Sequence, residues 1–320
     1  MHNIVIIGGG TGTSTLLEGL KKYPVNLSVI VTTSDDGGSS GILRRELGVL
    51  PPGDVRQCLV ALSANKKLAS IFAHRITSGE QKGHTIGNLI LANLEKELGS
   101  AEKAIDLVSN FLHVNGSVIP VTLNPTILSA TLENGKVIEG EHNIDEPLGD
   151  IRYKIEDIRL KPGIQANPKA LEAISQADVI VFGPGDLHTS TLPNLLVKGV
   201  KEAINTSRAK KVLVTNIMIK NGQTNGFKVS DFVNELERYL EGRITYVLAN
   251  NTKPEARIQK LYKKEKAEFV ELDSKNINAK IISGNLSSKV VFTKSKGDIL
   301  NRSIIRHNAK KLARIIYELI

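Results

Sequence analysis

The N-terminal segment joins a strongly apolar run to a glycine-rich turn. Residues 4–13 read IVIIGGGTGT, so four apolar β-formers pass directly into glycine and threonine before Leu16 and Leu17. This pattern predicts a buried strand followed by a helix. Glycine lets the backbone approach a ligand closely, and the free amides at a helix N-terminus favour an anion. We therefore predict a phosphate-binding turn, formed by Gly9, Gly10, Thr11, Gly12 and Thr13.

Other interpretations of this turn stay open. It matches the dinucleotide fingerprint G-x-G-x-x-G only in part, because Thr13 or Thr15 stands where the third glycine belongs. It is not a P-loop, because no Gly-Lys-Ser or Gly-Lys-Thr follows. A glycine turn needed only for tight packing of strand against helix is the competing explanation, and the sequence favours phosphate binding over it.

Strand and helix patterns alternate along most of the chain. The strand candidates are short, nearly continuous runs of β-branched residues at 4–7, 27–31, 179–182, 212–216, 244–248 and 269–272. Such runs are typical of strands buried on both faces of a parallel sheet. We expect an α/β fold with a mostly parallel, doubly wound sheet, organised as one domain over residues 1–320.

One stretch breaks the alternation. Residues 117–144 are strand-like throughout, and Asn134-Gly135 within them is a strong hairpin signal. Because so short a segment cannot bury a core alone, we predict a small antiparallel β excursion attached to the main sheet.

Three helix starts can be predicted from capping residues. Asp54 is expected to cap a helix over 55–64, Asn167 and Pro168 to open one over 169–177, and Ser230 to cap one over 231–240.

The composition limits the classes of function. The chain has 320 residues and a formal net charge of +9, which suits an anionic small ligand. Aromatic residues make up only 4% and tryptophan is absent, so stacking platforms are poor and we expect no nucleic-acid partner. A single cysteine, Cys58, excludes a disulfide framework. No secretory signal and no apolar stretch of membrane-spanning length are visible, so we expect a cytoplasmic protein.

A second glycine turn follows the second strand candidate and carries two acids and two serines: Asp35, Asp36, Ser39 and Ser40. An acid at this place in a doubly wound fold can bind a ribose hydroxyl, and an acidic pair can hold Mg²⁺, with Asp36 as the candidate ligand. Asp-Gly is also ordinary turn chemistry, and either serine can cap a helix. Having all four polar residues in one turn favours a ligand.

Two further segments carry candidate ligand-binding or catalytic residues, each of which also has a possible structural role. Asp54 is first of all a helix cap, while Arg56 is placed to reach a phosphate bidentately. His84 and Asn88 stand four residues apart at an expected helix start, where a histidine bonded to the backbone is favoured over a general base.

A third glycine turn follows the apolar run at 179–182. Gly183 and Gly185 give a tight turn, and Asp186 and Thr189 add polar groups. Ligands collect at the carboxyl ends of the strands in such sheets. We expect all three turns to converge on one cleft.

The chain as a whole resembles the YvcK/CofD-like family. The matching segments, in order, are GGGTG at 8–12, DDGGSSG at 35–41, PPGDVR at 51–56, GHTIGNL at 83–89, ADVIVFGPG at 177–185, TSTLPNLL at 189–196, NIMIKNGQTNGF at 216–227 and RHNAKKLA at 306–313. The resemblance implies a three-layer, Rossmann-like fold with a cleft for a nucleotide diphosphate.

The family has two branches, which imply different functions. DDGGSSG and PPGDVR resemble the bacterial YvcK-type gluconeogenesis factors. That branch implies a regulator that binds a UDP-N-acetylglucosamine-type nucleotide sugar without turnover and controls cell-wall precursors and cell shape. It further implies a regulatory protein partner in cell-wall or central carbon metabolism. Whether the chain also forms a homodimer stays open. No cofactor beyond the nucleotide is expected to be required, and Mg²⁺ stays an option.

The resemblance also assigns site residues. Tyr262 and Arg306 fall at positions that look like nucleotide-sugar contacts of the family, and Asn216, in the matching segment 216–227, is a further candidate nucleotide-binding residue. A tyrosine can stack on a flat ring, and an arginine can grip a pyrophosphate. From the sequence alone, Tyr262 would be a half-buried helix residue and Arg306 a residue at a helix start.

The main alternative is a 2-phospho-L-lactate transferase-like enzyme with a nucleotide diphosphate donor such as GDP and Mg²⁺. NAD-dependent redox chemistry ranks third, because the fingerprint is incomplete and no acid/base pair for hydride transfer is evident.

This chain departs from the family pattern at four positions that bear on the ligand. Asp186 and His188 replace serine and tyrosine, and Gln223 and Asn225 replace two acids. We expect an extra carboxylate at Asp186 to repel a phosphate unless Mg²⁺ intervenes.

Overall fold

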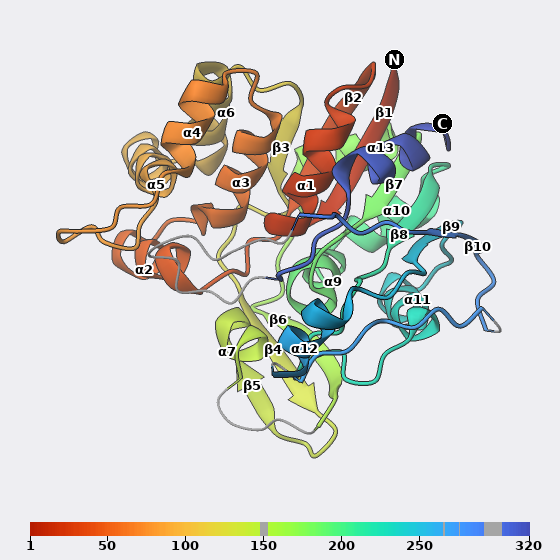
Figure 1. The fold of residues 1–320 in the computed structure, drawn as a ribbon. Coiled ribbons are helices and arrows are strands. Elements are labelled where there is room, and N and C mark those ends of the chain that lie inside the picture. Colours follow the sequence, from red (N-terminus) through yellow and green to blue (C-terminus); the bar gives the residue numbers. More distant parts are fainter. Residues whose placement is uncertain (148–152, 265, 275, 291–302) are drawn as a thin grey trace.

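A parallel seven-stranded sheet forms the centre of the molecule (Figure 1). The computed structural model describes residues 1–147, 153–264, 266–274, 276–290 and 303–320. Every pair of neighbouring strands in this sheet is parallel. Across the sheet the order is β10 (Lys280–Gly284), β9 (Tyr246–Asn250), β8 (Lys210–Val214), β7 (Val179–Phe182), β1 (His2–Gly8), β2 (Val25–Val31) and β3 (Ser117–Pro120).

Helices cover both faces of this sheet, which confirms the expected three-layer α/β fold. Successive residues of a strand point to opposite faces, so Val5 and Ile7 lie in one apolar core and Ile4 and Ile6 in the other. The first core is completed by α8 (Pro168–Ser175), α9 (Leu192–Leu195), α10 (Val200–Thr206) and α11 (Val229–Leu240). The second is completed by α1 (Thr11–Leu20), α3 (Pro52–Leu62), α5 (Ile86–Leu98), α6 (Ala101–Leu112) and α13 (Ala309–Tyr317).

The remaining helices lie at the margins of the sheet. α2 (Gly38–Leu47) and α4 (Lys66–Ala73) join α3, α5 and α6 in a helical lobe on the left of Figure 1. α12 (Ala256–Lys264) follows β9. None of the helices in the described parts of the chain combines the length and apolar character needed to traverse a bilayer.

The direction of chain progression reverses between β1 and β7. From β1 the chain moves outward through β2 to β3, and it later returns to β7 on the other side of β1 before moving out to β10. The loops after β1 and β7 therefore leave the same edge of the sheet side by side and turn toward opposite layers. Ligand sites of doubly wound proteins form at this switch point.

The antiparallel excursion differs from the prediction for residues 117–144. Residues 117–120 form β3, a parallel edge strand of the main sheet. The antiparallel strands are β4 (Ile127–Leu132), β5 (Val137–Glu139) and β6 (Ile155–Lys161), and they form a separate sheet below the main one in Figure 1. α7 (Glu141–Asp145) takes the end of the predicted segment. The predicted hairpin is present, with Gly135 at φ 79° between β4 and β5.

Some predicted strand and helix bounds are wrong. Residues 269–272 form no strand, only an isolated bridge from Phe269 to Met218. The edge strand is β10, whose half-exposed KIISG lacks the continuous apolar pattern of the buried strands. Predicted strands 212–216 and 244–248 are each shifted by about two residues from β8 and β9.

Two of the three predicted helix caps are wrong. Asp54 lies inside the first turn of α3, whose cap position is Pro51. Ser230 likewise lies inside α11, where its hydroxyl donates to Asp273 at 2.6 Å. The third is confirmed, because the Asn167 side chain accepts from the Lys169 amide at 2.9 Å.

The C-terminal helix α13 lies directly against α1 (Figure 1). A Cβ atom on Gly19 would collide with the backbone oxygen of Ala309, so the two helices can approach this closely only because residue 19 is glycine. This contact fixes the chain that leads into α13, which contributes Arg306 and His307 to the cleft described below.

We predict that Gly19→Ala destabilises the protein by about 1–3 kcal/mol, because α13 must move away from α1. Gly163→Ala is the matched control, since its Cβ would meet only Lys198 Cε at 3.8 Å. Urea unfolding measures both. A Gly19→Ala protein as stable as the control would show that the helices do not depend on this approach.

Candidate functional site

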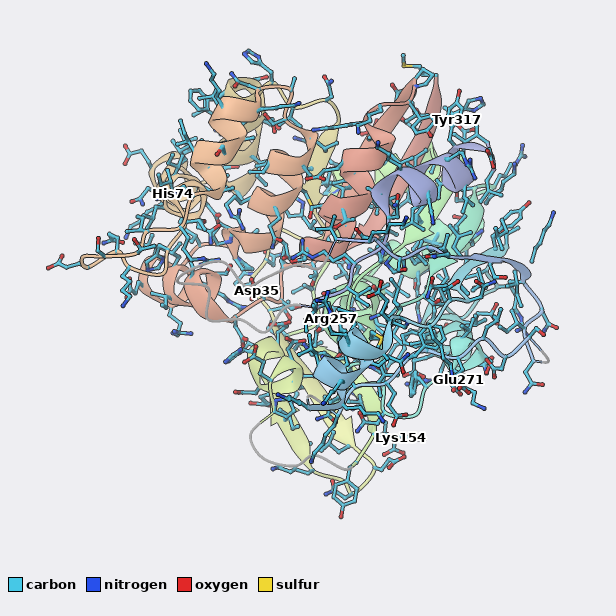
Figure 2. All side chains as sticks on the ribbon, viewed as in Figure 1. Asp35, His74, Lys154, Arg257, Glu271 and Tyr317 are labelled. Atoms are coloured by element: carbon cyan, nitrogen blue, oxygen red, sulfur yellow. The ribbon has the colours of Figure 1, made fainter. Side chains whose placement is uncertain are left out.

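A cleft of about 220 Å³ opens at the carboxyl ends of the sheet strands. It is lined by the turn after β1, the turn after β2, the start of α3, the turn after β7 and the segment after β8. Figure 2 shows Asp35, from the turn after β2, between α2 and α7. The expected convergence of the three glycine turns on one cleft is therefore what the structure shows.

The turns meet at glycines that have no room for a side chain. A Cβ atom on Gly9 would lie 2.8 Å from Ser190 Oγ and 2.9 Å from Asp54 Oδ2. A Cβ atom on Gly12 would overlap the carbonyl oxygen of Pro184 in the third turn. The first turn, the start of α3 and the third turn thus interlock, and their backbones are exposed to the cleft at close range.

Most residues predicted from the sequence line this cleft. They are Gly9, Gly10, Thr11, Gly12, Asp35, Ser39, Ser40, Asp54, Arg56, Asn88, Gly185, Asp186, Thr189, Asn216 and Arg306. Their placement makes them available to a ligand, and their role in binding stays a prediction.

Four predicted residues stand behind the cleft. Thr13 Oγ1 packs 2.6 Å from the point where a Cβ on Gly8 would lie, and Gly183 is a turn residue at φ 73°. Tyr262 is buried, and its hydroxyl accepts the Ile305 amide at 2.9 Å. Asp36 Oδ1 accepts the His142 amide at 2.8 Å at the start of α7. These residues hold the walls of the cleft in place.

A chain of buried hydrogen bonds orients Arg56. Its Nε donates to Asn88 Oδ1 at 2.8 Å, and Asn88 Nδ2 donates to Ser39 Oγ at 3.0 Å. Ser39 Oγ in turn lies 2.9 Å from His84 Nδ1. Thr85 caps α5 beside this histidine, so His84 stands at a helix start as predicted. Its ring contacts the Ser39 hydroxyl, whereas a bond to the backbone was expected. Ser39 and Ser40 lie in the first turn of α2 and do not cap it.

Several carboxylates also line the cleft. Burial raises the pKa of Glu141 well above its usual value, and the charges of Asp35 and Asp145 act in the same direction. Burial also raises the pKa of Asp35, against hydrogen bonds from Gly37 and Ser40. These acids come from two segments, the turn after β2 and α7, so the fold concentrates negative charge here and increases the cost of ionising Asp35 and Glu141.

Lys220 offsets part of this charge. Its Nζ lies 3.1 Å from Asp145 Oδ2 and 3.7 Å from Asp186 Oδ2. Burial would lower the pKa of Lys220, but the two carboxylates outweigh it and hold that pKa above its ordinary value. Burial raises the pKa of Asp186 to about 6, with Asp145 adding to the rise and Lys220 opposing it. The extra acid at position 186 thus has a cationic partner within the protein.

The other departures from the family pattern also have partners. Gln223 Nε2 donates to Asp145 Oδ1 at 2.9 Å, a contact that an acid at this position would turn into repulsion. Asn225 Oδ1 accepts the Gly222 amide at 3.0 Å. His188 is fully buried, and its Nε2 lies 3.2 Å from Glu235 Oε1 of α11.

The cleft offers oxygen ligands of the kind Mg²⁺ uses. Mg²⁺ is usually held by one or two carboxylates together with waters and phosphate oxygens. Asp35, Glu141 and Asp145 line the cleft and suit such a role, whereas Asp36 faces α7. Within the described ranges, no group of three or more His, Cys, Asp or Glu side chains is placed to hold a metal ion by itself.

Several cleft residues were missed by sequence reasoning. Lys220, Glu141, Asp145, Arg75 and His307 all line it. Both acids sit on α7, where Glu141 falls in the stretch 117–144 predicted as strand and Asp145 lies one residue beyond it. Lys220 and His307 stand inside segments that carried the family resemblance, and that was the only signal pointing to them.

Comparison with known proteins decides the family. The family profile described as 2-phospho-L-lactate transferase CofD matches residues 4–287. The chain belongs to the CofD family. A relative from Thermotoga maritima is 45% identical over 98% of this chain and 98% of its own. A Bacillus subtilis relative named gluconeogenesis factor is 38% identical over 99% of this chain and 98% of its own.

A solved structure supports the same conclusion. The crystal structure of a Bacillus halodurans protein superimposes with a TM-score of 0.90 at 39% identity, covering 99% of this chain and 98% of that one. This CofD-family chain thus shares its overall fold with a solved structure.

The raised pKa of Asp186 predicts a pH dependence of stability. A carboxyl whose pKa is about 6 in the folded protein and near 3.8 when unfolded binds its proton more tightly in the folded state. Its stabilising contribution is complete below about pH 4 and is lost as the pH rises through 6. Between pH 4 and 7, the free energy of unfolding of the wild type should fall by on the order of 1 kcal/mol relative to that of Asp186→Asn.

Urea unfolding across this pH range tests the prediction. Glu97→Gln, an exposed helical change outside the cleft, is the control and should follow the wild-type profile. If Asp186→Asn also follows the wild-type profile, Asp186 does not titrate as described.

Proposed function

We propose that this protein is a gluconeogenesis factor that binds a UDP-N-acetylglucosamine-type nucleotide sugar in the cleft. It acts in the cytoplasm as a regulator of cell-wall precursor supply and cell shape, through a protein partner in cell-wall or central carbon metabolism. The name carried by the Bacillus subtilis relative supports the assignment as a gluconeogenesis factor. The interlocked glycine turns, which bring backbone and helix N-termini to one cleft, support the ligand class.

The diphosphate is the part of the ligand that the cleft suits best. α1 begins at Thr11 directly after the first glycine turn, so its free amides and dipole are directed at an anion there. Thr189 Oγ1 is buried in the cleft lining with no hydrogen-bond partner among the described residues, and a phosphate oxygen would satisfy it. Arg56 lines the cleft, and the contact of its Nε with Asn88 Oδ1 orients its planar guanidinium, a group that suits a phosphate.

The acidic wall suits the sugar. Carboxylates accept hydrogen bonds from vicinal hydroxyl groups. Asp35, Asp145 and Asp186 line the cleft, the last two beside Lys220. When bound, Mg²⁺ would supply positive charge between these acids and the diphosphate. Binding without turnover requires no further group.

A transferase is the second candidate, and one observation favours it. The matching family profile carries the name of 2-phospho-L-lactate transferase. Such an enzyme would move a phosphoryl-linked group from a nucleotide diphosphate donor, and it would release a nucleotide product. A regulator would bind the nucleotide sugar and return it unchanged.

Calorimetric titration with UDP-N-acetylglucosamine, GDP and NAD, with and without Mg²⁺, separates these functions. We expect saturable binding of the UDP-sugar and its full recovery by chromatography. Release of a nucleotide product would replace the regulator with the transferase. Binding of NAD alone would reject both.

Arg56→Lys should weaken UDP-sugar binding about tenfold or more, because lysine keeps the charge but loses the planar fork. Arg45→Lys is the matched control, since Arg45 is exposed on α2 outside the cleft lining. Equal affinities for the two variants, with unchanged melting temperatures, would place the diphosphate away from Arg56.

A further inference from the structure

One end of the cleft differs in chemistry from the rest. Near the end of β8 its lining contains Ile217 and Met218 together with Ile305, whereas the remaining walls are mostly glycine, hydroxyl and charged side chains. Ile217 and Met218 directly follow Asn216, and both are buried. Apolar side chains of this kind suit the flat faces of a ring, and the polar walls suit phosphate and sugar.

Tyr262 holds this apolar end in place. Its buried hydroxyl accepts a hydrogen bond from the backbone amide of Ile305. This bond fixes the segment that brings Ile305, Arg306 and His307 into the cleft. The isolated bridge between Ser287 and His307 and the contact of α13 with α1 fix the same segment from its other side. The position of His307 is therefore set by three separate elements.

His307 presents an unsatisfied acceptor at this end. The side chain lines the cleft and is more than nine-tenths buried, and its Nε2 has no hydrogen-bond partner among the described residues. Burial lowers the pKa of His307 to about 4, and a hydrogen bond to the Thr215 backbone opposes that shift. Because this hydrogen bond raises the pKa, it stabilises the charged ring. The ring must therefore be the donor and the Thr215 carbonyl the acceptor. The ring is thus neutral at physiological pH.

The tautomer follows from these contacts. With one ring nitrogen carrying the proton toward Thr215, the unpartnered Nε2 holds the lone pair and can only accept. Leaving a buried acceptor unpaired costs free energy, so a ligand that brings an N–H or O–H donor to this point is favoured. An apolar pocket with one buried acceptor matches the edge of a planar base that carries a ring N–H.

Resting on the function proposed above, we propose that His307 selects the base of the nucleotide, with Nε2 accepting the ring N–H of a lactam base while Ile217, Met218 and Ile305 pack against its faces. Uracil has this donor at N3 and guanine at N1. Cytosine and adenine have a ring acceptor at the equivalent edge, which would oppose the lone pair of Nε2 and leave both acceptors unsatisfied. His307 is then a specificity-determining residue.

The competing role for His307 is purely structural, as a tie between the C-terminal segment and β8. That role would change stability but would not distinguish one base from another. The ratio of affinities for two nucleoside diphosphates that differ only in the base separates the two roles, because stability cancels from the ratio.

The experiment measures dissociation constants of UDP, CDP, GDP and ADP at pH 7.5 for the wild type, His307→Leu and His307→Gln. We expect the wild type to bind UDP about tenfold more tightly than CDP, as one discriminating hydrogen bond allows. His307→Leu should lose this ratio chiefly through weaker UDP binding, and His307→Gln, whose amide oxygen can accept, should restore part of it. The GDP to ADP ratio shows whether the purine lactam is read in the same way.

The control is His74→Gln, an exposed histidine outside the cleft lining. A wild type that binds nucleoside diphosphates without preferring UDP over CDP overturns the role of His307 and leaves the cleft function standing. An unchanged UDP to CDP ratio in a folded His307→Leu protein does the same. A wild type that binds none of the four nucleotides rejects the proposed function itself.

Discussion

The structure depends on the close approach of the turns after β1 and β7, which is possible only without side chains at the first turn. The carbonyl of Pro184 occupies the space that a Cβ atom of Gly12 would need, and Ser190 and Asp54 crowd Gly9 in the same way. The parallel sheet brings these turns to one edge, since β1 and β7 are neighbours at the switch point. Glycine then allows them to close, and the cleft is the space that remains.

Acidic and basic side chains from several segments lie around this space. Asp35 from the turn after β2 lies near Glu141 and Asp145 of α7, which raises the cost of ionising Asp35 and Glu141, while Lys220 joins Asp145 to Asp186. The anion-attracting start of α1 and Arg56 line the same cleft. A ligand with a negative centre, a hydroxyl-rich end and a flat apolar end matches this division. Nucleotide sugars are ligands of that kind.

Sequence patterns predicted the parts of the fold that local physics controls. Continuous β-branched runs identified β1, β2 and β7, and the glycine turns after them marked the cleft edge. The half-exposed β10 and the short edge strand β3 lack that pattern, so one was missed and the other was assigned to the wrong sheet. Which cleft residues face the ligand and which stand behind it depends on packing between distant segments. Asp36 and Tyr262 are examples, because their partners His142 and Ile305 lie far along the chain.

Hydrogen–deuterium exchange with and without UDP-N-acetylglucosamine tests most directly whether the turns act together on one ligand. The backbone amides concerned are those at the start of α1, in the first turn of α3, and in residues 187–191 after the third glycine turn. A diphosphate held among the interlocked turns should slow exchange in all three segments at the same ligand concentration. Protection confined to one of them, or found only outside the cleft, would contradict this account.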